Sequence, residues 1–318
     1  MTACTHADAA LIPLLGARDY ITGQPFDVCR CGGCGLALTA PPPGDLGPYY
    51  PASYYRPNGA RRFPAPVEWL QRRLCASRAR VVERLVGGPG SVLDIGCGPG
   101  LFLDAFRRRG WEAHGTELSD RSAEHARTLG LPVQVGPLES WPWSDASFDA
   151  VVMWHALEHW PHPELALAAA HRLLRPGGVL LVGVPNFGSP EARDAREGWF
   201  HLDVPRHLHH FTPEALADAL ASAGFLPRRR SFFAPEFDLF SAVQSLENRL
   251  GLRHNLLYNL LRRRNARVLE EKAGAAQVLT SVLLAAPLGL LALPVTLLLS
   301  LLHRGSSMSV LAVRKAGV

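Results

Sequence analysis

The chain has little lysine, and one long stretch of it carries no charge. Only Lys272 and Lys315 among its 33 basic residues are lysine, and no charged residue occurs from position 273 to position 302. A preference for Arg together with abundant Ala, Gly and Pro is typical of a GC-rich coding sequence. The net charge of +5 therefore does not indicate a nucleic-acid partner, and we expect none.

The chain also lacks the pattern of a disulfide framework. Of the six Cys residues, Cys75 falls in a predicted helix and Cys97 in a glycine-rich loop, and neither position suits a disulfide framework. The first residues lack a basic run followed by an apolar core, so we expect no secretory signal peptide. These absences favour a protein of the reducing cytoplasm.

Composition divides the 318 residues into several parts, as one large domain with additions would. We expect a Cys-rich module at 1–40, a Pro-, Gly- and Tyr-rich linker at 41–66, and a main α/β domain at 67–235. A helical, apolar insertion at 236–305 and a final strand at 306–318 complete the predicted organisation.

The main domain alternates between strand and helix patterns. Strands are predicted at 91–95, 112–117, 132–135, 148–153 and 179–184, and helices at 101–109, 120–129 and 163–174. A further helix enters through Thr212, a good N-cap residue, with Pro213 at the first helical position. Repeated strand–helix units predict a parallel sheet with helices on both faces.

A glycine-rich loop follows the first strand of this domain. The strand ends in Asp94 and leads into Gly96-Cys97-Gly98-Pro99-Gly100, after which a helix begins. The glycines permit a tight turn and a close backbone approach to a ligand. Glu117 ends the next strand, where a carboxylate can accept hydrogen bonds from ribose hydroxyls. The spacing differs from the G-x-G-x-x-G of dinucleotide loops, although an NAD-type loop or a purely structural turn stays an alternative.

This loop resembles motif I of the class I S-adenosylmethionine-dependent methyltransferases. The segments 147–149 and 155–163 resemble a block of the family that includes the ubiquinone and menaquinone biosynthesis methyltransferases, and 174–178 resembles the turn before its fifth strand. The likeness covers about residues 88–235 and the final strand. It implies a Rossmann-like, seven-stranded methyltransferase sheet with helices on both faces, and S-adenosylmethionine as the cofactor.

The resemblance assigns ten residues to the cofactor site. They are Asp94, Gly96, Cys97, Gly98, Gly100, Glu117, Leu118, Leu138, Trp154 and His155. One departure concerns adenine, because many relatives carry an Asp after the third strand that accepts a hydrogen bond from the adenine amino group. This chain has Gly136-Pro137-Leu138-Glu139 there. Adenine recognition is therefore expected to rest on the backbone N–H of Leu138 and on packing.

Methyl transfer from a sulfonium requires alignment of the reactants, and a hydroxyl acceptor also requires a base or a metal ion. Ligands bind beyond the carboxyl ends of parallel strands. The fourth strand is followed there by His155, Glu158 and His159, and the fifth by Asn186. The H-x-x-E-H spacing also fits the inverted zinc-protease motif, but its position directly after a sheet strand favours the methyltransferase interpretation.

A second histidine group lies further along the chain, in the segment 199–212, which resembles another segment of the same family. It contains His201, His207, His209 and His210. We expect His159 or His207 to act as the general base, with His155 as a further catalytic candidate. A metal site and a purely structural loop that covers the cofactor are the alternatives.

A cysteine knuckle lies near the start of the chain. Cys31-Gly32-Gly33-Cys34-Gly35 is similar to the second half of a zinc ribbon, a module that precedes several methyltransferases. A structural zinc site needs four ligands, and only Cys4 and His6 offer a first half, with Cys29 as a spare thiol. We expect zinc on Cys4, His6, Cys31 and Cys34. A degenerate knuckle that has lost its metal is the alternative.

The uncharged stretch at 273–302 is long enough to enter a bilayer, but Pro287 and Pro294 interrupt it. The resemblance places this stretch between a sixth strand near 229–234 and a seventh at 309–313, which pair antiparallel in one sheet. Both ends must then lie on one side of a membrane. We expect a hairpin that turns at the two prolines, or a pair of surface helices.

An arginine-rich flank accompanies this stretch. Six arginines and no acid lie between residues 248 and 269, and Leu256, Leu257, Leu260 and Leu261 form an apolar face at helical spacing. A basic amphipathic helix suits an anionic membrane surface. A buried helix pair that covers the sheet, or a dimer interface, is the alternative.

Together these features predict O-methylation of a lipophilic or lipid-linked acceptor at a membrane surface. C-methylation of a quinone or sugar is one alternative, and a non-catalytic adenosylmethionine-binding membrane scaffold is another. The expected location is cytoplasmic, peripheral or monotopic at the inner face of the cell membrane, with a small-molecule or lipid-linked substrate.

Overall fold

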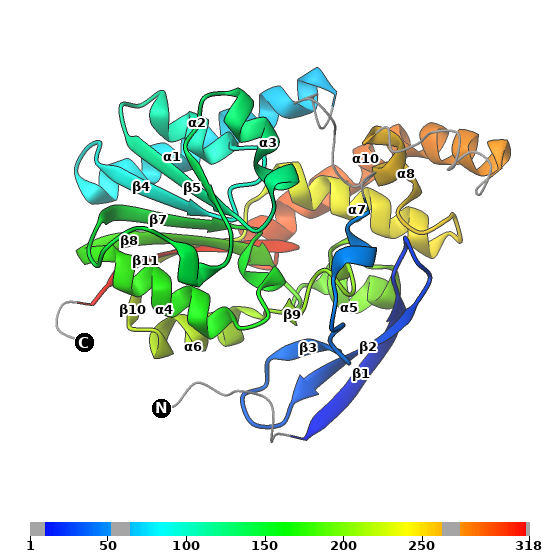
Figure 1. Ribbon diagram of the computed structural model, residues 1–318. Helices are drawn as coiled ribbons and strands as arrows, with labels where there is room; N and C mark the ends of the chain where they lie inside the picture. The colour runs from blue at the N-terminus through cyan, green and yellow to red at the C-terminus, as the bar shows by residue number, and fades with distance from the viewer. Residues whose placement is uncertain (1–9, 52–63, 263–273, 316–318) are drawn as a thin grey trace.

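The computed structural model describes residues 10–51, 64–262 and 274–315. A large central sheet with helices on both faces dominates the molecule (Figure 1). A small second sheet from the start of the chain and an arm of helices from its later part lie beside the central sheet.

The central sheet has seven strands in the order β10-β11-β8-β7-β4-β5-β6. The strands are β4 (Ser91–Ile95), β5 (Glu112–Glu117), β6 (Val133–Val135), β7 (Phe148–Trp154), β8 (Leu174–Pro185), β10 (Phe225–Ser231) and β11 (Ser307–Arg314). From β6 to β8 neighbouring strands are parallel, whereas β11 runs antiparallel to both β8 and β10. The chain leaves β4 toward β6 and returns to β7 on the other side of β4, which creates a topological switch point.

This order confirms the expected seven-stranded, Rossmann-like sheet with an antiparallel last strand. The sixth strand lies earlier than predicted, at Phe225–Ser231 instead of 229–234. Phe225 is fully buried and anchors the start of the strand, while Arg228, Arg229 and Arg230 are exposed. An edge strand often carries exposed charged residues, because they discourage pairing with other chains. The arginine run therefore lies within the strand.

Helices cover both faces of the sheet because its central strands are apolar on both sides. One face packs against α1 (Ala65–Val86), α2 (Leu101–Arg107) and α3 (Asp120–Thr128). The other face packs against α4 (Pro163–Leu173) and α6 (Pro213–Ser222).

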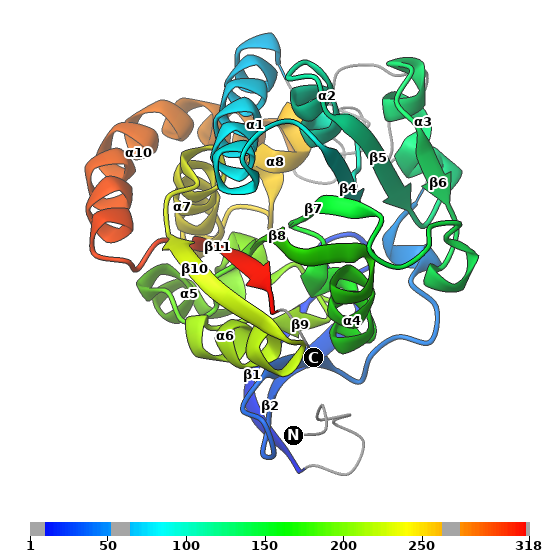
Figure 2. The same cartoon turned by 90° about the vertical axis from the view of Figure 1, so that its left-hand side faces the viewer.

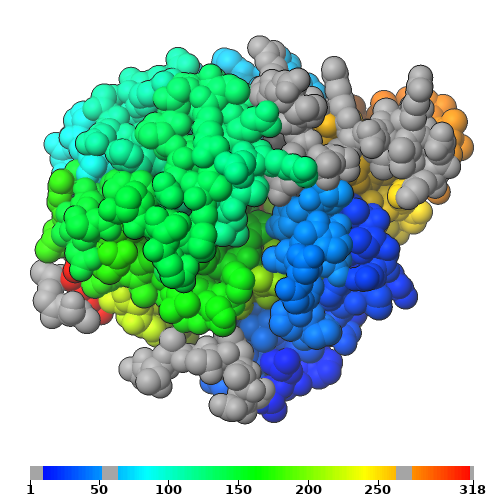
Figure 3. Space-filling view, viewed as in Figure 1, coloured from blue at the N-terminus to red at the C-terminus, as the bar shows by residue number. Residues whose placement is uncertain are grey.

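The first strands of the chain form a second, antiparallel sheet with a strand of the main domain. Its order is β1 (Leu11–Arg18), β2 (Pro25–Cys31), β3 (Ala37–Ala40) and β9 (His209–His210). Its core is shared with Trp199, Leu202 and Val204 and with α5 (Pro190–Ala195). The space-filling view shows these N-terminal strands packed closely against the main domain (Figure 3). The described part of this module is therefore built into the main domain.

Between β10 and β11 the described residues form three helices. They are α7 (Pro235–Arg249), α8 (Leu256–Leu261) and α10 (Ala275–Leu301). The predicted hairpin turn at Pro287 and Pro294 is wrong, because α10 continues through both prolines as one helix. The prolines lie seven residues apart on the outward side. Loss of hydrogen bonds on that side curves a helix instead of breaking it, and α10 follows an arc beside α7 (Figure 2).

The entry into α6 gives a simple test of the local structure. The Thr212 hydroxyl accepts a hydrogen bond from the Ala215 N–H, as the N-cap prediction requires. Thr212→Ala should lower the free energy of unfolding by about 0.5–2 kcal/mol. Thr212→Ser retains the acceptor and serves as the control. Equal stability of the Ala and Ser variants in urea denaturation would contradict the cap.

Candidate functional site

The loop at 96–100, here the cofactor loop, joins β4 to α2 at the carboxyl end of the parallel strands. Gly96 and Gly100 both have positive φ, and a Cβ on either would lie within 3 Å of neighbouring carbon atoms. A Cβ on Gly98 would have only the Glu117 Oε1 near it, at 3.9 Å. Packing therefore requires the outer two glycines, and Gly98 leaves open space where a ligand can approach the backbone.

Two carboxylates lie beside this loop. Glu117 Oε1 accepts a hydrogen bond of 2.6 Å from the Gly98 N–H, and Oε2 accepts one of 3.2 Å from the Leu118 N–H. Asp94 is buried next to it, and burial together with the Glu117 charge raises the pKa of Asp94 to about 8. A ligand with positive charge would stabilise both carboxylates in their ionised forms.

The remaining predicted cofactor residues lie at the same carboxyl end of the parallel strands. Cys97, within the loop, is buried, while the Leu118 side chain just before α3 is 69% exposed. Leu138 begins a short 3₁₀ helix, Leu138–Ser140, after β6. Trp154 and His155 lie at the end of β7, where the Trp154 ring packs 5.5 Å from that of Phe102. The structure thus brings the ten predicted residues to the carboxyl ends of β4, β5, β6 and β7.

Sequence reasoning missed a layer that covers Trp154 and His155. The Arg78 guanidinium of α1 lies 4.2 Å above the Trp154 ring and forms an ion pair with Glu236 at the start of α7. The Phe237 ring stacks on His155 at 4.2 Å. No local motif marks these residues, because they meet only when α1 and α7 cross the sheet edge.

Four side chains form what is here called the histidine cluster: His155, Glu158, His159 and His207. His155 Nδ1 lies 3.4 Å and His207 Nε2 lies 3.9 Å from Glu158 Oε1. The rings of His159 and His207 are 4.7 Å apart. Burial alone would raise the pKa of Glu158, but its contact with His155 and the charges of the three histidines lower it to about 2.

The backbone fixes the orientation of two rings. His159 Nδ1 lies 2.8 Å from the Arg206 carbonyl, and His207 Nδ1 lies 2.7 Å from the His201 carbonyl. A carbonyl only accepts, so each Nδ1 carries the proton and each Nε2 is left as the basic nitrogen. Burial lowers the pKa of His207 to about 4, which keeps its ring neutral near pH 7. A neutral imidazole can take a proton or bind a metal ion.

Glu158, His159 and His207 also offer three potential ligand atoms within 4.8 Å of one another. A carboxylate with two histidines whose Nδ1 atoms contact backbone carbonyls is a donor set that suits a divalent transition metal. The geometry therefore supports both interpretations of the cluster, a general base or a metal ion.

The other candidate site residues form contacts that hold the fold and do not join the histidine cluster. Asn186 is buried, donates to the Gly305 carbonyl and accepts from the Gly188 N–H, so it holds the loop before β11. His210 contacts the Thr39 hydroxyl at 3.0 Å. Burial lowers the pKa of His201 well below its usual range. Of the four histidines in 199–212, His207 is the one that joins the cluster.

The N-terminal knuckle is a tight turn. The Gly35 N–H donates to the Cys31 carbonyl at 2.9 Å, and Gly35 has a positive φ of 77°. Cys31 is buried and Cys34 is exposed. The other two proposed zinc ligands, Cys4 and His6, lie outside the described residues.

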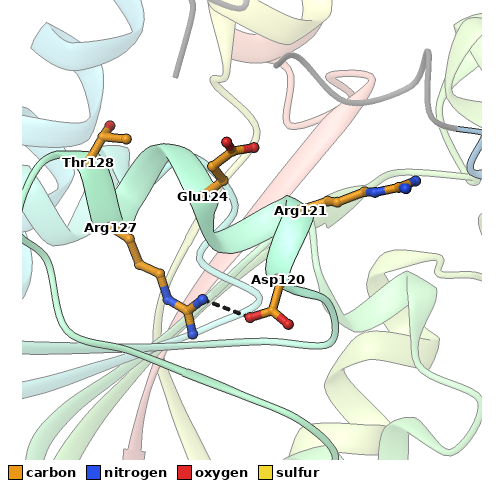
Figure 4. A pocket seen from close by; sticks show the side chains of 5 residues that line it. All are labelled: Asp120, Arg121, Glu124, Arg127 and Thr128. Carbon is orange, nitrogen blue, oxygen red and sulfur yellow. Dashed lines mark hydrogen bonds and ion pairs between the residues drawn. The ribbon is translucent and has the colours of Figure 1, made fainter. Parts of the chain in front are cut away.

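A shallow hollow elsewhere on the surface does not belong to this site. It lies along α3 and is lined by Asp120, Arg121, Glu124, Arg127 and Thr128 (Figure 4). An ion pair of 2.7 Å between Arg127 and Asp120 lies within it. All five side chains come from one helix and none is a predicted site residue, so the hollow is an ordinary charged helix face.

Comparisons with known proteins agree with this geometry. The model of a family described as "Methyltransferase domain" matches residues 67–227. The malonyl-[acyl-carrier protein] O-methyltransferase of Erwinia billingiae is 32% identical over 51% of this chain and 65% of its own length. The ubiquinone biosynthesis O-methyltransferase of Paracidovorax citrulli is 34% identical over 42% of this chain and 61% of its own length. The chain thus spans about three-fifths of the length of these curated relatives.

Solved structures that match this chain include a SAM-dependent methyltransferase from Archaeoglobus fulgidus. It is 26% identical, with a TM-score of 0.43 over 51% of this chain and 73% of that chain. The family match covers half of the chain, and the observed seven-stranded sheet is the one that the resemblance implied. The chain therefore belongs to the class I S-adenosylmethionine-dependent methyltransferases.

Proposed function

We propose that this methyltransferase transfers the methyl group of S-adenosylmethionine to a hydroxyl of a lipophilic or lipid-linked acceptor, at the cytoplasmic face of a membrane. The observation that carries the membrane part of the proposal is the outward face of α10. The histidine cluster supplies the base or metal that a hydroxyl acceptor needs.

Helix α10 has its large apolar side chains on the outside. Its inward side chains are small or polar, and Ser281, Ala292 and Thr296 are buried. Leu290 and Leu301 on the outward side are 74% and 78% exposed. Surface helices of soluble proteins show the opposite pattern. Only 6% of the most apolar 18-residue window is buried, so the alternative of a buried helix pair is wrong for this helix.

Polar contacts attach α10 to the rest of the protein. The Ser281 hydroxyl donates to Glu247 Oε2 of α7 at 2.8 Å, and both side chains are fully buried. Gln277 Oε1 accepts from the Arg253 N–H at 3.0 Å. The helix is long and apolar enough to cross a bilayer, but these contacts and its link to β11 favour a helix that lies along the surface.

The helix also ends close to the site. β11 begins at Ser307, which pairs with Pro185 at the carboxyl end of β8. The last turn of α10 therefore lies toward the carboxyl end of the sheet, the end that carries the cofactor loop and the histidine cluster. A bilayer in contact with α10 would present its lipids beside that end of the sheet.

The predicted arginine-rich helix contributes less than expected. In α8 the residues Leu256 and Leu257 are buried, so its apolar side faces the protein. Arg262 is buried as well and donates to the Tyr258 hydroxyl. Arg249 forms an ion pair with Asp194, and the three arginines at 263, 264 and 267 lie outside the described residues.

Oxygen is favoured as the acceptor atom because the two relatives described above are O-methyltransferases by name. C-methylation and a non-catalytic scaffold are the competing functions. Incubation with methyl-labelled S-adenosylmethionine and a lipid extract of the source organism separates them. The proposal requires label in an ether linkage. Label on carbon supports C-methylation, and absence of transfer supports the scaffold.

The cofactor loop gives the first prediction about the functional site. Gly98→Val places a side chain in the open space at the loop and should abolish binding of S-adenosylhomocysteine in calorimetry. Glu117→Ala should weaken binding by about 1–3 kcal/mol, because hydrogen bonds to a charged group are lost. Gly98 and Gly130 both have positive φ, and a Cβ on Gly130 would have no atom near it, so Gly130→Ala is the control for backbone strain. Unchanged affinity in both site variants would contradict the assignment of the loop.

The histidine cluster gives a second prediction about the functional site. His207→Gln should lower the rate of label transfer by about 10²–10⁴-fold, the usual contribution of a general base, with S-adenosylhomocysteine affinity unchanged. His159→Gln serves as the parallel variant. A wild-type rate that falls with a chelator and returns with a divalent cation assigns the cluster to metal binding. Full rates in both variants would exclude the cluster from the reaction.

The outward face of α10 gives a third prediction, on membrane binding. Leu290→Glu with Leu291→Glu should weaken binding to phosphatidylethanolamine–phosphatidylglycerol vesicles by at least about tenfold, since burying one Leu is worth about 1.5–3 kcal/mol. Leu85→Glu changes a half-exposed leucine on α1 and is the control. A wild-type protein that ignores vesicles but forms a dimer sensitive to these substitutions would establish a dimer interface instead.

The N-terminal cysteine knuckle gives a fourth prediction, on zinc binding. We propose that Cys31 and Cys34 hold a structural zinc ion with Cys4 and His6. Freshly prepared protein should then contain about one zinc per chain by elemental analysis, lost in Cys34→Ser. Cys75→Ser changes a cysteine remote from the knuckle and should retain the metal. Metal-free wild-type protein would establish a degenerate knuckle.

A further inference from the structure

The segment 206–210 lies between the histidine cluster and the N-terminal sheet. On one side the Arg206 carbonyl accepts from His159 Nδ1, and the Leu208 N–H donates to the Glu158 carbonyl at 2.9 Å. On the other side the segment becomes β9 and pairs with β3, with Leu38 opposite His209. One short strand thus connects the cluster to a module that enters from the far end of the sequence.

Thr39 of β3 contacts this segment three times. Its N–H donates to the Leu208 carbonyl at 3.0 Å, and its hydroxyl donates to the His207 carbonyl at 2.6 Å. The hydroxyl has a single hydrogen, so it must accept from His210 Nε2, 3.0 Å away. Thr39 is buried, and these bonds therefore fix the backbone of His207 in a site that water does not reach.

Arg206 forms a second attachment. Its guanidinium is fully buried and lies 2.8 Å from Asp19 Oδ1 and 2.7 Å from Asp203 Oδ1. It also donates to the Tyr49 carbonyl and lies 4.4 Å over the Tyr20 ring. Removing one partner of a buried ion pair is strongly destabilising because the remaining charge cannot return to water. Asp19 thus holds the residue next to His207 from the N-terminal side.

We infer that Thr39 and Asp19 of the N-terminal sheet are positioning residues for His207, so that the module completes the methyl-acceptor site instead of forming a separate metal-binding appendage. The inference rests on the proposed function, since it assumes that His207 serves the transfer. It does not depend on zinc in the knuckle, because every contact it uses comes from protein atoms.

Two pairs of matched variants test the inference. Thr39→Val removes the hydroxyl while keeping the side-chain shape, and Thr39→Ser restores it. Asp19→Asn removes the charge that faces Arg206, and Asp27→Asn makes the same change at an exposed position of β2. The measurements are the S-adenosylhomocysteine affinity, the amide hydrogen exchange of residues 204–211, and kcat and KM for S-adenosylmethionine with the lipid extract as acceptor.

Thr39→Val and Asp19→Asn should speed amide exchange in 204–211 and lower kcat by about 10–100-fold, as small misplacements of catalytic groups do. The KM for S-adenosylmethionine and the S-adenosylhomocysteine affinity should stay at wild-type values. Thr39→Ser and Asp27→Asn should match the wild type throughout.

Wild-type kcat in both Thr39→Val and Asp19→Asn would overturn the inference, even if exchange in the segment is faster. An equal loss of cofactor affinity would also overturn it, because the effect would then be general destabilisation. If the wild type transfers no label, the proposed function fails. The exchange measurement then still decides whether Thr39 and Asp19 hold His207 in place.

Discussion

The pairing of β11 with both β8 and β10 constrains the arrangement of the later half of the molecule. β11 is inserted antiparallel between the two strands, and Val310 and Ala312 on it are buried in the core. The segment between β10 and β11 must therefore leave the sheet and return to the end of the sheet from which it left, which is the carboxyl end of β8. This requirement brings the last turn of α10 to the carboxyl end of the sheet, where the cofactor loop lies. Under the proposed membrane association, it favours a helix that lies along the membrane surface.

The carboxyl end of the sheet combines two chemical environments. Around the cofactor loop, Glu117 lies beside a buried Asp94 whose pKa is raised to about 8, and a cationic sulfonium cofactor would stabilise both carboxylates in their ionised forms. Around His207, burial favours neutral rings, and backbone carbonyls orient His159 and His207. Charge complementarity favours cofactor binding, and under the proposed function a neutral base or metal ligand would serve the acceptor. The two environments are separated by the end of β7, which supplies Trp154 to one and His155 to the other.

The sequence predicts the parts of this structure that depend on local pattern. The cofactor loop, the carboxylate at Glu117 and the N-cap at Thr212 follow from residue types at fixed spacing. The seven-stranded sheet and the antiparallel pairing of its last two strands follow from the family resemblance. It does not predict contacts between distant segments. Thr39 and Asp19 lie far in sequence from His207, and Arg78 reaches Trp154 only across the fold. The path of α10 was mispredicted because prolines on an outward face bend a helix without ending it.

The central claim is that the protein methylates a hydroxyl of a membrane-associated acceptor. Mass spectrometry of lipids and quinones from a strain that lacks the gene tests it most directly. The account predicts that a lipid-soluble species lighter by one methyl group accumulates, carries a free hydroxyl, and disappears when the wild-type gene is restored. A missing methyl group found only in water-soluble metabolites, or an unchanged lipid fraction, would contradict it.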